Sequence, residues 1–249
     1  MKRFIILFFS CVLVLNVQCI IDTNSNKTKN NPDNSGNDIH TYLSPSLTGL
    51  VSTWQMKSYD ATDSLTNSLT FIKTITGPVV LDGHNYYTIH YSIPGTFTDR
   101  FSVELNSIYF QVQEHMFDGR ILGTAQSTPL GTDVAFFNFS GTPGVMAHIS
   151  EGGTMTDDLY VNFDIQSMLQ THETVTTPLG TFDNCPTFQL KFTVTHTPKV
   201  TGDTHHYDRI ETHWFGKGTG PVKKTAEYYA DGTFYARAVY EIASISTSD

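Results

Sequence analysis

Four histidines lie close together in the C-terminal third of the sequence and are the first candidates for metal chemistry: His196, His205, His206 and His213. Neutral imidazole is the commonest metal ligand in proteins. Zinc sites carry their ligands at recognisable spacings, such as Cys-x-x-Cys or His-Glu-x-x-His, and neither spacing occurs here. Adjacent residues of an extended chain point in opposite directions, so His205 and His206 would rarely share one ion. We therefore expect no metal site, no cofactor and solvated loop histidines.

Carboxylates could supply acid–base chemistry, as in glycoside hydrolysis, which uses two carboxyl groups on either side of a sugar bond. The sequence has many of them, including Asp157, Asp158, Glu173, Asp203, Asp208 and Glu211. No spacing among them singles out a pair, and no Gly-x-Ser-x-Gly nucleophile motif occurs. The segment Asp60–Asn67 lacks the Gly and the terminal Glu of a helix-loop-helix calcium site. We assign no catalytic residue and expect that the protein is not an enzyme.

Cys185 lies in an unusual segment, Thr176–Phe188, which reads TTPLGTFDNCPTF. A nucleophilic cysteine needs a nearby base and a lowered pKa, whereas a lone thiol is most often a small buried hydrophobe. Pro178 cannot donate a hydrogen bond to a neighbouring strand, and Gly180 can adopt a positive φ. The segment is therefore predicted to be a hairpin corner in which Phe182 points into the core.

The elements that would position these residues are strands. From Thr187 to Val194, apolar residues alternate with polar ones, and the same period of two recurs over 87–93, 108–113 and 234–242. Asp-Gly pairs at 82–83, 118–119 and 231–232 suit type I′ hairpin turns. Gly216, Gly218 and Gly220 lack the spacing of a phosphate loop and predict a bend or bulge. The one segment that could be helical is Asp158–Thr171.

These patterns predict an all-β fold: a single curved antiparallel sheet, a meander or half-barrel, with at most one or two short helices. One-sided patterning means that one face of the sheet is covered and the other is wet. Aromatic residues fall on both faces, at Trp54, Trp214, 86–87, 136–137 and 228–229. Exposed tyrosines are ordinary strand formers, but on an uncovered face they could also stack on sugars or line an apolar groove.

The N-terminus predicts export. Lys2 and Arg3 precede an apolar run from Phe4 to Val17, which suits a signal peptide and is short for a membrane span of about 20 residues. The run ends at Cys19, the position of a lipid attachment site, although Gln18 stands where small residues are preferred. Ordinary cleavage nearby, which would release a secreted protein, is the alternative. We expect a signal peptide over 1–18 and acylation of Cys19.

A polar segment follows Cys19. Residues 21–38 are rich in Asn, Asp, Ser and Lys and cannot bury apolar surface. We therefore predict a lipidated, disordered tether over 19–41 and one all-β domain over 42–249. Cleavage removes Lys2 and Arg3 from 15 basic residues and none of the 24 acidic ones, which leaves a formal charge of −11. An acidic surface repels phosphates, so nucleic acid is not an expected partner.

Two motifs carry a resemblance to a known class of proteins: ETVTTPLGTFDNC, from Glu173, and THWFGKGTGPVKK, from Thr212. They resemble the Pro-x-Gly-Thr-Phe…Cys corner and the Trp-aromatic-x-x-Gly-x-Gly-x-Val-Lys strand of uncharacterised bacterial envelope lipoproteins. Leu179, Pro186 and the longer segment before Trp214 depart from that pattern. The resemblance implies a half-barrel similar to that of lipoprotein carriers, where a curved sheet can shelter an apolar ligand, and it implies no catalytic residues.

The sequence thus predicts a non-catalytic lipoprotein of the cell envelope, at the outer membrane or cell surface, which binds an apolar or lipid-like ligand in its curved sheet. Its predicted link to the membrane is the lipid on Cys19. The sequence assigns no ligand-binding residues. Two alternatives from other classes are a secreted hydrolase that acts on glycans and a glycan-binding module.

Overall fold

The alternating segments of the chain form long strands. The computed structural model describes residues 38–44, 46–81, 83–92, 98–111, 133–140, 144–155 and 159–247. Their elements in chain order are one short helix followed by twelve strands: α1 (Ile39–Tyr42), β1 (Leu50–Asp60), β2 (Leu65–Leu81), β3 (His84–Tyr91), β4 (Thr98–Glu104), β5 (Ser107–Gln111), β6 (Asp133–Asn138), β7 (Gly144–Met155), β8 (Leu159–Thr177), β9 (Gly180–Pro198), β10 (His205–Gly216), β11 (Gly220–Ala230) and β12 (Thr233–Thr247).

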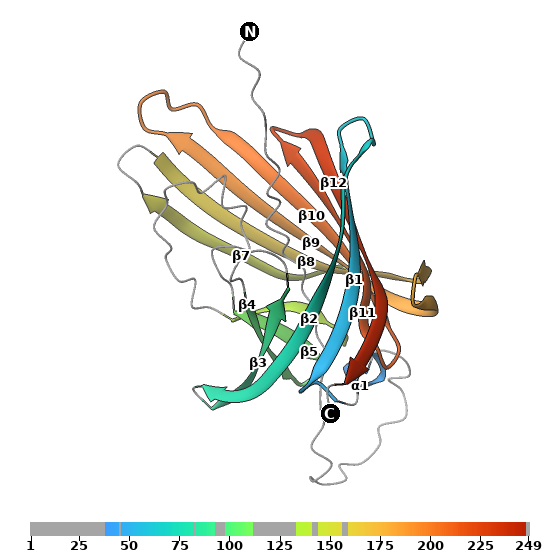
Figure 1. Ribbon diagram of the computed structural model, residues 1–249. Coiled ribbons are helices and arrows are strands. Elements are labelled where there is room, and N and C mark those ends of the chain that lie inside the picture. The colour runs from blue at the N-terminus through green and yellow to red at the C-terminus, as the bar shows by residue number, and fades with distance from the viewer. Residues whose placement is uncertain are drawn as a thin grey trace.

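The described strands make a single antiparallel sheet in the order β6-β5-β4-β3-β2-β1-β12-β11-β10-β9-β8-β7. Figure 1 shows that this sheet is strongly curved. The edge strand β6 returns toward the other end of the sheet, where the Ser167 hydroxyl of β8 donates to the carbonyl oxygen of Phe136 at 2.5 Å. The predicted all-β fold, a curved antiparallel meander with little helix, is confirmed.

The period-two pattern places the core on one face of the sheet, which we call the inner face. On β9, Phe188, Leu190, Phe192 and Val194 are buried while the residues between them are partly exposed. The described core falls into two clusters. One is rich in phenylalanine and includes Phe101, Phe110, Phe136, Phe137, Phe139, Phe188 and Phe215; the other surrounds Trp54, Met56, Phe71, Val222 and Tyr240.

Turn chemistry ends the strands where the sequence predicted. Asp231 and Gly232 both adopt positive φ, at 48° and 77°, between the paired residues Ala230 and Thr233. This is the geometry of a type I′ turn. The β8–β9 hairpin turns at Pro178 and Leu179, between Thr177 and Gly180, so the predicted corner is present but shorter than expected, because β9 already begins at Gly180. The pair 118–119 lies outside the described residues.

Asp158–Thr171, which could have been helical, falls largely within strand β8, because its pairing with β9 satisfies the backbone. Residues 38–41, at the end of the predicted tether, are described, and Ile39 is fully buried against the phenylalanine-rich cluster. The predicted signal peptide, Cys19 and the rest of the tether lie outside the described residues. Within the described part of the chain, no helix has the length and apolar character needed to cross a membrane.

Candidate functional site

Charged side chains occupy the middle of the inner face. On β10, Arg209, Glu211 and His213 follow one another at every second position, so all three point inward. Glu211 and His213 are fully buried, and Arg209 is 8% exposed. Lys224 on β11, Lys73 on β2 and Asp99 on β4 are buried as well. We call these six residues the inner charge cluster: Lys73, Asp99, Arg209, Glu211, His213 and Lys224.

Small neighbours make room for these long side chains. Glu211 is in register with Ala226 of β11, and Ala226 is in register with Ala238 of β12. Both alanines are buried, so the inner face is shallow at this level of the sheet. Lys224 lies two residues from Ala226 on β11, and Arg209 lies two residues from Glu211 on β10, on the opposite side of this pair. Both can therefore extend their charged ends toward Glu211.

Glu211 is the hub of the cluster. Lys224 Nζ donates to Glu211 Oε1 at 2.8 Å, and His213 Nε2 lies 2.9 Å from Glu211 Oε2. Arg209 Nε also lies 3.1 Å from Oε1. One carboxylate is thus shared by two cations and an imidazole in a site that excludes water, where such charge pairs interact strongly.

Burial and charge together set the protonation states. Burial lowers the pKa of His213 to about 4, although Glu211 opposes the shift, so the ring is neutral at physiological pH. A neutral ring next to a carboxylate donates through Nε2, which leaves Nδ1 as a bare acceptor. Burial alone would raise the pKa of Glu211, but Lys224, Arg209 and His213 outweigh it and hold that pKa below its ordinary range. Burial lowers the pKa of Lys224 to about 8.

Arg209 is the least satisfied member of the cluster. Its Nε and Nη2 atoms are buried and have no hydrogen-bond partner among the described residues. Arg209 Nε forms an ion pair with Glu211 Oε1 at 3.1 Å, but the contact does not have hydrogen-bond geometry. The guanidinium instead lies over the Phe192 ring, with Cζ 4.2 Å from the ring centroid. Arg209 is therefore a buried cation at the outer end of the cluster, and its Nε and Nη2 donors make no hydrogen bond to the described residues.

The other half of the cluster sits beside aromatic rings. Lys73 Nζ lies 3.8 Å from the Trp54 ring centroid, a cation–π contact. Burial, followed by repulsion from Lys224, lowers the pKa of Lys73 well below its ordinary value. The Tyr91 hydroxyl donates to Asp99. Lys73 also lines a small cavity of about 10 Å³, which is room for one water molecule.

On the side of Arg209 that faces away from Glu211, the inner-face residues of β10 and β11 are only partly buried. Along β10, burial is complete at Phe215, His213 and Glu211, slight exposure begins at Arg209, and Tyr207 is only half-buried. Along β11, Val222, Lys224 and Ala226 are buried and Tyr228 is half-buried. The Tyr228 ring lies 6.1 Å from that of Tyr235, which is also half-buried. We call Tyr207, Tyr228 and Tyr235 the aromatic strip.

The structure corrects the expectation of solvated histidines at His213, which is a buried core residue. Its strand alternates inward at that position, and its ring packs against Phe137 with centroids 5.0 Å apart. His205 and His206 are exposed, as expected, and lie beside Asp231. His196 is half-buried against Tyr207. In the described ranges, no three His, Cys, Asp or Glu residues are grouped to hold a metal ion.

Among the described residues, the carboxylates noted in the sequence do not converge. Asp157 and Asp158 lie outside the described residues, Glu173 accepts a hydrogen bond from Trp214 Nε1 at 2.8 Å, and Asp208 pairs with Lys191 at 3.0 Å. Asp203 is exposed in the β9–β10 loop.

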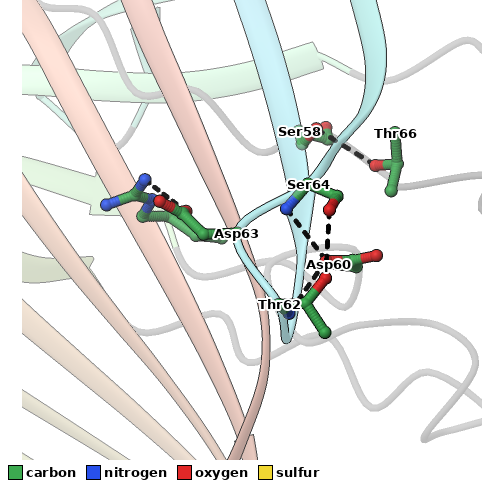
Figure 2. A network of polar contacts seen from close by, with 7 residues as sticks. Ser58, Asp60, Thr62, Asp63, Ser64 and Thr66 are labelled. Atoms are coloured by element: carbon green, nitrogen blue, oxygen red, sulfur yellow. Dashed lines mark hydrogen bonds and ion pairs between the residues drawn. The ribbon is translucent and has the colours of Figure 1, made fainter.

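The β1–β2 hairpin uses its acids to build its own turn (Figure 2). Asp60 Oδ1 accepts from the backbone N–H and the hydroxyl of Thr62, at 2.8 and 2.7 Å, and from the N–H of Ser64 at 3.0 Å. Asp63 pairs with Arg237 at 2.6 Å. These carboxylates have structural partners and form no acid–base pair.

Cys185 is fully buried beside the hairpin corner. Burial raises its pKa to about 11, with further contributions from Asp183 and Glu173, so the thiolate is disfavoured. Its Sγ lies 3.5 Å from the Phe182 carbonyl oxygen. The interpretation as a small buried hydrophobe is thus supported by its surroundings. Phe182 is half-buried and covers Gly216, where an added Cβ would lie 2.6 Å from its ring; the predicted contact of Phe182 with the core is present.

Comparisons with known proteins add distant neighbours. No protein-family model and no curated protein matches the sequence. Among solved structures, a putative lipoprotein from Parabacteroides distasonis ATCC 8503 aligns over 83% of this chain and 99% of its own, with 14% identity and a TM-score of 0.43. A putative exported protein with a YmcC-like fold from Bacteroides fragilis NCTC 9343 aligns over 83% and 100%, with 14% identity and a TM-score of 0.38. At this level of similarity, neither description transfers to this chain.

Proposed function

We propose that the protein is a non-catalytic lipoprotein of the cell envelope, held at the outer membrane or cell surface by Cys19, whose curved sheet binds an apolar or lipid-like ligand. The aromatic strip carries the ligand-binding part of the proposal. Inner-face side chains of β10 and β11 change from fully buried to half-buried at Tyr207 and Tyr228. Apolar binding surfaces with a few placed polar groups are typical of small-molecule sites.

The buried carboxylates favour a binding protein over a glycan hydrolase. A glycosidase acid needs a raised pKa so that it holds a proton near neutral pH. The pKa of Glu211 is shifted in the opposite direction by its cationic neighbours. Asp99, the other carboxylate of the inner charge cluster, accepts a hydrogen bond from Tyr91. The cluster is therefore better suited to holding a fixed charge than to exchanging protons with a substrate.

Lipid attachment is tested by labelling cells that express the full chain with an alkyne-tagged palmitate. We expect the label on the wild-type protein and its complete loss in Cys19→Ser, because the acylated thiol is then absent. Cys185→Ser is the matched control and should keep the label, since Cys185 is buried in the folded domain. Wild-type protein that is exported and cleaved without any label would contradict lipid attachment and favour a secreted protein.

Ligand binding is tested with the neutral fluorescent probe N-phenyl-1-naphthylamine. We expect a saturable rise in fluorescence with the purified full chain, reversed by dodecanol. Tyr228→Ser should weaken probe binding by about tenfold, because an aromatic contact is worth about 0.5–1.5 kcal/mol beyond the area that it buries. Tyr229→Ser is the control, because the adjacent residue faces the other side of β11 and bonds to Glu227 at 2.8 Å. Absence of saturable binding would refute the ligand-binding function.

A further inference from the structure

We infer that the ligand of the inner face is an amphiphile with one anionic head group, a carboxylate or a phosphate monoester, and that Arg209 binds this group. The inference rests on the proposed ligand-binding function and adds the chemical class of the ligand. It depends on three features of the described structure: the idle donors of Arg209, the balance of charge around Glu211, and the position of Arg209 at the end of the packed core.

The idle donors of Arg209 are the two that recognise oxyanions. Nε–H and one Nη–H of a guanidinium form a planar fork that matches the two oxygens of a carboxylate or phosphate. Nε and Nη2 of Arg209 are both buried and without hydrogen-bond partners among the described residues. A buried donor without a partner costs about 1–3 kcal/mol, and more when it is charged. A bound oxyanion would satisfy both donors at once.

The charges around Glu211 leave room for one more anion. Oε1 accepts from Lys224 and Oε2 is next to His213, so both oxygens already have well-placed partners. Two cations, Arg209 and Lys224, contact this one carboxylate, and the whole inner charge cluster holds three basic side chains against two acidic ones, Asp99 and Glu211. Buried charges are normally paired, because an uncompensated one is costly. A single anionic group beside Arg209 would balance this part of the cluster.

Arg209 also lies where the head group of an amphiphile would meet its chain. It is the outermost charged residue on the inner face of β10, with buried Glu211 on one side and half-buried Tyr207 on the other. It is in register with Phe192 of β9 and Tyr228 of β11, so aromatic side chains flank it on both neighbouring strands. A head group at Arg209 would place the apolar chain along the aromatic strip.

The test compares ligands that differ only in their head group. Dodecanoate, dodecyl phosphate and dodecanol, each below its micelle concentration, compete with N-phenyl-1-naphthylamine for the purified full chain. We expect at least one of the two anions to bind about 10- to 100-fold more tightly than dodecanol, because a hydrogen bond to a charged group is worth about 1.5–3 kcal/mol. Acetate and inorganic phosphate should compete weakly, since they lack the chain. Competition by them as strong as by the long-chain anions would overturn the amphiphile in favour of a free anion.

Variants then assign the effect to Arg209. Arg209→Gln should bring the affinity for the anions down to that for dodecanol measured with the same variant, while Arg209→Lys should keep part of the preference. Arg237→Gln is the matched control, because Arg237 pairs with Asp63 at the β1–β2 hairpin. Thermal unfolding confirms that each variant is folded. If dodecanol binds but the wild type shows no preference for an anion, the inference fails and the proposed function stands. If no ligand and no probe binds, the proposed function itself fails.

Discussion

Glu211→Gln is expected to lower the free energy of unfolding by about 3–5 kcal/mol, the usual cost of removing one partner from a buried ion pair. Glutamine keeps the size of the side chain but not its charge, so Arg209 and Lys224 lose the carboxylate that compensates both. The loss should be smaller at alkaline pH, because burial already lowers the pKa of Lys224 to about 8 and the neutral amine costs less to bury. Urea unfolding at several pH values measures both effects.

The adjacent lysine offers a matched control for this experiment. Lys223 points to the opposite side of β11 from Lys224 and pairs with Glu241 at 2.9 Å, with a quarter of the Lys223 side chain exposed. Partly exposed pairs contribute about 1 kcal/mol or less, so Glu241→Gln should have a small effect. Equal effects of the two substitutions would mean that water reaches Glu211, and the buried charge cluster would have to be abandoned.

Stability is also expected to fall as the pH drops from about 6.5 to 4, by about 3 kcal/mol from His213 alone. The folded state lowers the pKa of His213 from the ordinary 6.5 to about 4, through burial first and through Lys224 and Lys73 in addition. Between these two pH values, the unfolded chain binds a proton that the folded chain does not, so acid favours unfolding. Below the ordinary glutamate pKa of 4.5, Glu211 adds to the loss, because its folded pKa is lower still.

His213→Gln isolates the histidine contribution. The glutamine amide can still donate to Glu211 and has no proton to gain, so the decline between pH 6.5 and 4.5 should disappear. His206→Gln is the control, because that side chain is exposed and should leave the curve unchanged. Urea midpoints measured across this range decide the matter. A wild-type curve that is flat down to pH 4.5, or a decline that persists in His213→Gln, would show that His213 is not held neutral by burial.

The sequence predicted the fold because its signals are local and repeated. The alternation of Phe188, Leu190 and Phe192, and the turn at Asp231-Gly232, each determine the backbone of their own segment. Curvature and strand order depend on contacts between distant segments, such as that between Ser167 and Phe136, and are less visible in the sequence. The lipid attachment site and residues 19–37 of the tether stay predictions, since they lie outside the described residues.

The candidate site was missed because β10 inverts the usual pattern. Its apolar outer residues, Ile210 and Trp214, are partly exposed, while the charged Arg209 and Glu211 face the core. A prediction from hydrophobicity alone would place Ile210 and Trp214 in the core and the charged residues in solvent. A signal was present: Arg209, Glu211 and His213 stand at every second position, so they share one face and can pair with each other. Which face is buried is decided by the neighbouring strands and by room next to Ala226 and Ala238.

The order of strands has a consequence for how the chain is assembled. β1 and β12, the first and last of the described strands, pair with each other in the interior of the sheet along eleven residues of β1. A chain that leaves a ribosome or a translocation channel with its N-terminus first therefore cannot pair β1 with β12 until β12, a strand of fifteen residues, has emerged. Distant pairings of this kind slow folding. Threading through a membrane pore requires an extended polypeptide, and this topology postpones the folded state until the passage is complete.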